Sequence, residues 1–219
     1  MRPTLPGDVL LLAAGPRARF LTRGPVQTVL AGALLCDALL PGGRPSPGRP
    51  AELRRLLDER ATTALAEAGE PLRAAGVIVP CEHRVLGLFR REGFTVLDLG
   101  ARTDAEQRLR AALTPGSSPD AADASLAVLC ALAGIARALV PPPASRADRD
   151  AVADHLNGLR TVLGPDLTAV LEATRARYHR DGGGEGAFVP VGSGDCYGDG
   201  GGSGGDGAGG DGGGGGGGD

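Results

Sequence analysis

The chain has 219 residues, with 23 basic and 26 acidic side chains, and every basic side chain is an arginine. From residue 181 onward it is almost only glycine with seven acidic residues and no basic one, so we expect residues 181–219 to be a disordered Gly/Asp-rich tail and residues 1–180 to form one domain. The remaining 19 acidic residues leave this domain a net charge of +4, which is too small an excess to indicate a nucleic-acid-binding protein.

The longest uncharged apolar runs, residues 29–36 and 125–136, are well short of the roughly 20 residues that a membrane-spanning helix needs. A shorter run at residues 9–14 is preceded by Asp8 and followed by proline and arginine, so we expect no signal peptide. The four cysteines are far apart and form no CxxC pair, which fits a reducing compartment. These observations predict a cytoplasmic protein.

In the first third of the chain, hydrophobic spacing predicts helices separated by one short strand. Residues 8–14 form a short apolar helix packed on the core, and residues 19–23 a short strand. Residues 25–40 form the first strong helix, apolar on nearly all sides and therefore central. A charged amphipathic helix follows at residues 51–67, and a second short piece at residues 71–75 ends at a glycine.

From residue 77 the sequence pattern changes from helical spacing to runs of β-prone residues. Two runs of β-prone residues, 77–79 and 85–89, flank a polar segment at residues 80–84. This pattern predicts a β-hairpin over residues 77–89 with its turn at residues 80–84.

In the second half of the domain the sequence predicts helices, and two of them begin with a capping-box pattern. Residues 103–106 match a capping box and predict a helix to residue 113, and residues 118–140 form the most apolar helix, ended by three prolines. A second capping-box pattern at residue 145 starts a helix that ends near residue 158. The last helix opens at residue 164 and places one apolar stripe on its inner side: Leu167, Val170, Leu171, Thr174 and Tyr178. The predicted class is mostly α: a helical bundle with buried central helices ringed by amphipathic helices, plus one β-hairpin.

Three sequence blocks, in this order, resemble the Golgi phosphoprotein 3-like family. The first joins residues 8–12 to the apolar run at 29–39, the second covers residues 71–89, and the third is the apolar helix at residues 119–134. The composition is similar to that of the bacterial branch of the family. The resemblance implies a helical bundle ringed by amphipathic helices, with one hairpin.

The resemblance also implies a function. Eukaryotic members are cytosolic peripheral proteins that bind phosphatidylinositol 4-phosphate on Golgi membranes and the tails of glycosyltransferases. The lipid pocket of the family uses one tryptophan and three arginines, but the corresponding positions here are Thr22, Ala31, Thr62 and Leu65, so this pocket is not carried over. The hairpin does match, and it implies membrane contact or homo-oligomer formation through four apolar residues: Val85, Leu86, Leu88 and Phe89.

Two groups of arginines form the predicted headgroup site. One group alternates along the short strand, so that its side chains share one face, and the other lies on the helix at residues 51–67. An arginine near an anionic membrane is worth about 1 kcal/mol, so several could act together. The candidate residues are Arg17, Arg19, Arg23, Arg54 and Arg60. The alternative is an ordinary solvated surface, because Asp58 and Glu59 lie among them.

The sequence predicts no enzyme, cofactor or metal site. Cys81 and His83 lie two residues apart, but two ligands do not make a structural zinc site. No nucleotide-binding glycine motif occurs in the domain, no lysine is available for a phosphate-binding loop, and no nucleophile with its base is recognisable.

The leading hypothesis is therefore a peripheral membrane-associated protein that recognises phosphatidylinositol 4-phosphate or another anionic lipid headgroup. The alternative is a protein–protein interaction module without lipid binding, which the unmatched family pocket favours. A winged-helix DNA-binding protein is a third possibility, suggested by the helices at residues 51–76, the hairpin and the arginines at 90 and 91. The small positive charge argues against it.

Overall fold

The computed structural model describes residues 4–14, 19–21, 24–40, 50–85, 89–139 and 145–182. Within these residues the chain forms eight helices and three strands, in the order α1 (Leu5–Ala13), β1 (Arg19–Leu21), α2 (Gly24–Leu39), α3 (Pro50–Ala74), β2 (Ile78–Val85), β3 (Phe89–Val96), α4 (Leu99–Leu113), α5 (Ala121–Leu132), α6 (Ile135–Leu139), α7 (Arg146–Val162) and α8 (Gly164–Arg180). The predicted mostly helical class is confirmed. No helix in the described part of the chain is both long and apolar enough to cross a membrane.

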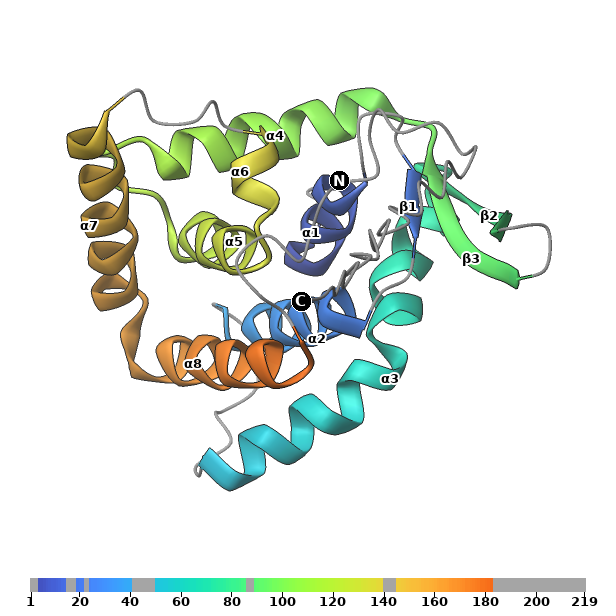
Figure 1. Cartoon of the computed structure of the whole chain (residues 1–219), viewed down its shortest axis with the longest axis horizontal. Coiled ribbons are helices and arrows are strands. Elements are labelled where there is room, and N and C mark those ends of the chain that lie inside the picture. Colours follow the sequence, from blue (N-terminus) through green and yellow to red (C-terminus); the bar gives the residue numbers. More distant parts are fainter. Residues whose placement is uncertain are drawn as a thin grey trace, which may run out of the picture.

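Helix α1 lies at the centre of the bundle. All nine of its residues are buried, and α2, α3, α4 and α5 pack around it. Figure 1 shows α1 and α5 framed by the longer helices α3, α4, α7 and α8, with the sheet at one edge of the molecule. The sequence predicted a short helix packed on the core at this position, and the structure makes it the most completely enclosed element of those described.

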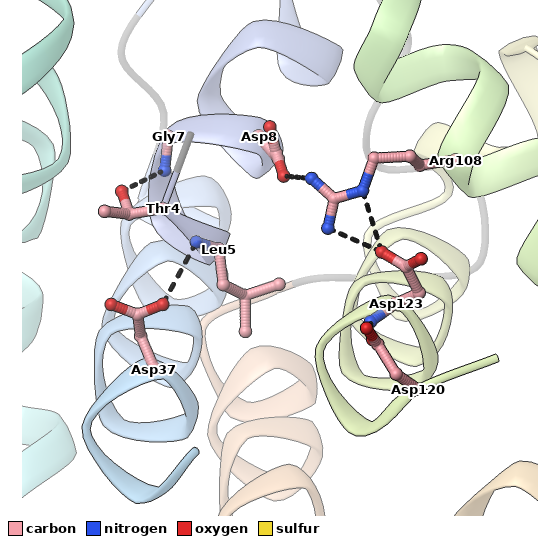
Figure 2. A network of polar contacts seen from close by, with 8 residues as sticks. All are labelled: Thr4, Leu5, Gly7, Asp8, Asp37, Arg108, Asp120 and Asp123. Carbon is pink, nitrogen blue, oxygen red and sulfur yellow. Dashed lines mark hydrogen bonds and ion pairs between the residues drawn. The ribbon is translucent and has the colours of Figure 1, made fainter. Parts of the chain in front are cut away.

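A buried network of polar contacts ties α1 to its neighbours (Figure 2). Asp8 on α1 is fully buried and forms an ion pair with Arg108 on α4. The Nε atom of Arg108 also donates to Asp123 on α5 at 2.8 Å. At the start of α1, the backbone N–H of Leu5 donates to Asp37 on α2 at 3.1 Å. These contacts supply partners for polar groups that the core would otherwise leave unsatisfied.

Helix α3 is continuous, whereas the sequence predicted two pieces divided before Pro71. Pro71 lies inside the helix. A proline removes one backbone hydrogen bond, but the buried residues Ala64, Ala68 and Leu72 continue the same inner face through this point. Packing against the core therefore keeps the helix intact to Ala74.

The sheet has the strand order β1-β3-β2, with both pairs antiparallel. The predicted hairpin exists, but its predicted turn at residues 80–84 is wrong, because these residues lie inside β2 and pair with β3 as far as Val85 opposite Phe89. Pro80 and the charged residues after it are tolerated because β2 is an edge strand, where a missing N–H and charged side chains cost little. The connection at residues 86–88 lies outside the described residues.

Two predicted helix boundaries in the second half are also wrong. Helix α4 begins at Leu99 rather than at residue 103, since the side chain of Asp98 caps it by accepting from the backbone N–H groups of Gly100 and Ala101. The helix predicted over residues 118–140 begins at Ala121, and Gly134, with φ of 72°, divides it into α5 and α6. A positive φ is readily adopted only by glycine, and this backbone conformation at Gly134 ends α5.

The last two helices follow the predictions more closely. Ser145 and Asp148 form the predicted capping box of α7, although the helix continues to Val162. The five residues of the predicted inner stripe of α8 are all buried.

Candidate anion-binding site

Of the five arginines of the predicted headgroup site, the structure describes the side chains of Arg54 and Arg60. Arg17 and Arg23 lie outside the described residues, and Arg19 is placed in β1 only by its backbone. Arg54 and Arg60 lie exposed on α3.

The surface of α3 is not a concentration of positive charge. Arg60 forms an ion pair with Glu67, and Arg55 pairs with Glu59 at 2.8 Å. The sequence of α3 contains four arginines and five acidic residues. Much of the positive potential of this helix is therefore cancelled before a ligand approaches.

The predicted hairpin site remains a prediction. Val85 ends β2 and Phe89 begins β3, but their side chains and the whole of Leu86 and Leu88 lie outside the part of the chain that the structure describes.

A better-defined basic site lies between α5, α6, α7 and α8. It is a pocket with a volume of about 180 Å³. Apolar side chains and Gly134 form part of the wall, and three arginines and one histidine form the polar part of it. The lining residues are Val128, Ala131, Leu132, Gly134, Arg137, Leu156, Arg160, Arg175, Tyr178 and His179. None of these described residues is acidic.

The fold assembles the positive charges of this pocket from three helices. The break at Gly134 sets the direction of α6, which carries Arg137. Arg160 lies near the end of α7. On α8, Arg175 and His179 are four residues apart and therefore occupy the same helix face.

The charged side chains of the pocket differ in their environment. Arg160 pairs with Glu172 on α8 at 3.3 Å, and Glu172 does not line the pocket. Arg137, Arg175 and His179 are exposed. A planar guanidinium group binds phosphate or carboxylate through two parallel hydrogen bonds, so this set of side chains suits an anionic ligand.

Tyr178 also lines the pocket. The side chain is almost fully buried, and its hydroxyl oxygen has no hydrogen-bond partner among the described residues. Burial raises the pKa of Tyr178, so the hydroxyl stays protonated near neutral pH. An unpaired buried hydroxyl is uncommon in folded proteins.

A second groove, of about 590 Å³, lies between α3 and the β2–β3 hairpin. Cys81 lines it, together with Phe94 and the oppositely charged pair Arg73 and Glu70, whose charged atoms are 2.6 Å apart. The described residues that line this groove therefore carry no excess of either charge. In the described parts of the chain, no group of three or more potential metal ligands comes together.

Sequence reasoning missed the basic pocket because its arginines are far apart in the chain. Arg137, Arg160 and Arg175 belong to three different helices, and no spacing rule connects them. Two local signals were available: the spacing of Arg175 and His179, and a glycine in the middle of an otherwise apolar helix.

These features define a mostly helical domain with a small antiparallel sheet at one edge and a basic pocket between its last four helices. The sequence profile of Golgi phosphoprotein 3 (GPP34) matches residues 45–174, and the chain belongs to this family. No curated protein and no solved structure matches the chain. The matched range runs from the segment before α3 into α8 and includes Arg137 and Arg160. Membership of the family is compatible with a binding role.

Proposed function

We propose that this protein is a peripheral membrane-binding protein that recognises an anionic lipid headgroup, with a phosphoinositide such as phosphatidylinositol 4-phosphate as the leading candidate. The observation that carries the proposal is the pocket in which Arg137, Arg160, Arg175 and His179 gather around apolar side chains. Phosphate oxygens would accept hydrogen bonds from the guanidinium groups, and the apolar wall would contact the carbon atoms of the headgroup.

The predicted arginines on α3 serve as a matched comparison for the pocket. Arg54 and Arg60 are exposed, as Arg137 and Arg175 are, but they lie on a helix with more acidic than basic residues. Replacing either pair by glutamine changes the net charge by the same amount. A difference between the two double variants would therefore report on position rather than on charge.

The test is co-sedimentation of the full chain with vesicles that are neutral, that carry phosphatidylserine, or that carry phosphatidylinositol 4-phosphate at matched charge. For Arg137→Gln/Arg175→Gln we expect binding to anionic vesicles to weaken by about 30-fold, since each arginine is worth about 1 kcal/mol. For Arg54→Gln/Arg60→Gln we expect a much smaller loss. Equal losses for the two pairs would mean that only the overall charge matters.

A protein–protein interaction module is the second candidate, and one observation favours it. Val79, Leu97 and Leu99 are exposed apolar side chains near the base of the sheet, and Leu99 is 60% exposed. Such residues can mark a protein contact surface. Absence of binding to every anionic vesicle at moderate salt would contradict the lipid proposal and leave this second function.

A further inference from the structure

Glu172 is an acidic side chain that contacts the basic pocket through Arg160. Its carboxylate lies 3.3 Å from the Nη1 atom of Arg160, and its side chain is 52% exposed. The described residues that line the pocket are arginines, a histidine, a tyrosine, a glycine and apolar residues. Glu172 therefore places a negative charge beside a group of basic side chains, at a position that solvent reaches.

The place of Glu172 on α8 brings it to the same side as the pocket. It lies three residues before Arg175 and seven before His179, and residues at these spacings share one helix face. The hydroxyl of Thr168, one turn before Glu172, donates to the backbone carbonyl of Arg160 at 3.0 Å. These contacts hold the end of α7 against α8, and the two helices meet at a corner of the molecule (Figure 1). The pair formed by Arg160 and Glu172 therefore lies at the edge of the pocket.

This pair retains hydrogen-bonding capacity of both kinds. Among the described residues, the guanidinium of Arg160 and the carboxylate of Glu172 have no other ion-pair or hydrogen-bond partner. A guanidinium has five N–H donors, and an ionised carboxylate only accepts, through two oxygens. Their contact with each other therefore leaves donors on Arg160 and acceptor capacity on Glu172 side by side.

A ligand that satisfies both groups must carry acceptors and a donor on neighbouring atoms. A phosphate group supplies the acceptors for the arginines, and a hydroxyl on an adjacent carbon supplies the donor for Glu172. A phosphate without such a hydroxyl brings its negative charge towards Glu172 and offers this carboxylate no hydrogen bond. Inositol phosphates and sugar phosphates carry both groups, whereas a phosphate on a plain alkyl chain carries only one.

We propose that Glu172 is a specificity-determining residue, which selects a phosphate ester with an adjacent hydroxyl over a phosphate without one. The inference rests on the proposed function for the location of the ligand, and it adds the chemistry that the ligand must have. A phosphoinositide headgroup in a membrane and a soluble polyol phosphate share this chemistry. The experiments therefore include both sources.

The first test compares two lipids that each carry a phosphate monoester. Phosphatidylinositol 4-phosphate has hydroxyls beside this phosphate and phosphatidic acid has none, so vesicles of the two at matched charge differ in the group that would contact Glu172. For the full chain we expect phosphatidylinositol 4-phosphate to bind about tenfold more tightly. Glu172→Ala should lower binding of this lipid and raise binding of phosphatidic acid, each by about threefold, so that the preference disappears.

Glu59→Ala is the matched control. Glu59 is 55% exposed and lies 2.8 Å from Arg55, so it is similar to Glu172 in exposure and pairing, but α3 contributes no described residue to the pocket. We expect its removal to change binding of both lipids by the same factor, below about twofold. Glu172→Gln keeps an acceptor oxygen without the charge, and should retain most of the binding of phosphatidylinositol 4-phosphate. If Glu172→Ala changed both lipids in the same direction and by the same factor, the carboxylate would act only through its charge and the proposal would be overturned.

The second test uses soluble ligands and requires no membrane. Amide NMR titrations of the full chain with inositol 1-phosphate and with ethyl phosphate compare a polyol phosphate with a plain phosphate ester of equal charge. We expect inositol 1-phosphate to shift the signals of pocket residues on α5, α7 and α8 at about tenfold lower concentration, and Glu172→Ala to remove this difference.

The outcomes separate this selection from the proposed function. Preference for inositol 1-phosphate that depends on Glu172, without vesicle binding, would support the selection and overturn the lipid function. Vesicle binding that Glu172→Ala changes equally for both lipids would overturn the selection alone. Absence of binding to both soluble ligands and to every vesicle would overturn both.

Discussion

Asp8 is an acidic side chain that folding removes from water. It lies in the centre of the bundle, and its environment has opposing effects on its ionisation. Burial raises the pKa of Asp8 from 3.8 to about 6, and the attraction of Arg108 lowers it by less. The folded state therefore binds a proton at this carboxyl more readily than the unfolded chain does between pH 4 and 6. Ionised Asp8 consequently opposes folding above this range.

We expect Asp8→Asn to change how stability depends on pH. The difference of about 2 pKa units corresponds to about 3 kcal/mol at most. The Asp8 contribution to the free energy of unfolding is highest below pH 4 and falls as the pH rises through 6. Denaturant unfolding of both proteins at several pH values should show wild type losing stability relative to Asp8→Asn between pH 4 and 7. A constant difference would mean that Asp8 does not titrate in this interval.

The sequence did not reveal this side chain as part of a core ion pair. Asp8 interrupts the start of an apolar run, and its partner Arg108 lies 100 residues away. The arginines of the basic pocket were missed for the same reason. Periodicity identifies which residues face inward, but a contact between distant helices depends on how the helices are arranged.

At the scale of elements, the sequence predicted which segments are helical more accurately than where they begin. Ser145 was identified correctly as a cap because three prolines precede it in the sequence and an amphipathic pattern follows. Thr103 has the same type of pattern but lies inside α4, where its hydroxyl donates to the carbonyl of Leu99. Since β3 ends at Val96, the chain turns at once and Asp98 becomes the cap. The end of β3 at Val96 therefore explains why Asp98, and not Thr103, caps α4.

The close approach of α2 and α8 depends on a missing side chain. A Cβ atom at Gly32 would lie 2.5 Å from the Oγ1 atom of buried Thr174. Gly158 on α7 also lies within a helix, but a Cβ atom there would have no heavy atom within 4 Å. Alanine substitutions at these two glycines therefore distinguish the effect of packing between helices from the intrinsic preference of a helix for alanine.

We expect Gly32→Ala to destabilise the fold by about 1–3 kcal/mol through overpacking. Gly158→Ala should stabilise it by about 0.5–1 kcal/mol, because alanine has the higher helix propensity and meets no obstacle. Chemical denaturation measures both changes. Thr174→Ala removes the two nearest atoms, Oγ1 and Cγ2, and leaves the Cβ of residue 174 at 3.1 Å, so adding Gly32→Ala to that variant should cost much less than it does in the wild type. A large further loss in the double variant would show that helix spacing is not limited by Thr174.

At the scale of the whole molecule, α8 contacts the rest of the bundle through two of its faces. One side contributes Arg175 and His179 to the basic pocket. The other side contacts α2 and α3, where Arg177 forms an ion pair with Asp58 and its Nε atom donates to Thr28 at 3.3 Å. These contacts fix the last helix against elements from the first third of the chain. The sequence predicted the buried stripe of α8 but not this polar attachment, whose partners belong to distant segments.

The attachment of α8 predicts an energetic coupling between Asp58 and Arg177. The Arg177 side chain is only 18% exposed, so removing Asp58 leaves a poorly hydrated charge with Asp181, at 3.2 Å, as a remaining carboxylate partner. In a double-mutant cycle with alanine at both positions, we expect a coupling energy of about 1–2 kcal/mol, measured by denaturant unfolding. The exposed pair Arg55 and Glu59 is the control and should show a much smaller coupling that falls further as salt is added. Equal couplings would mean that Asp58 and Arg177 are only a surface pair, and that apolar packing alone holds α8 in place.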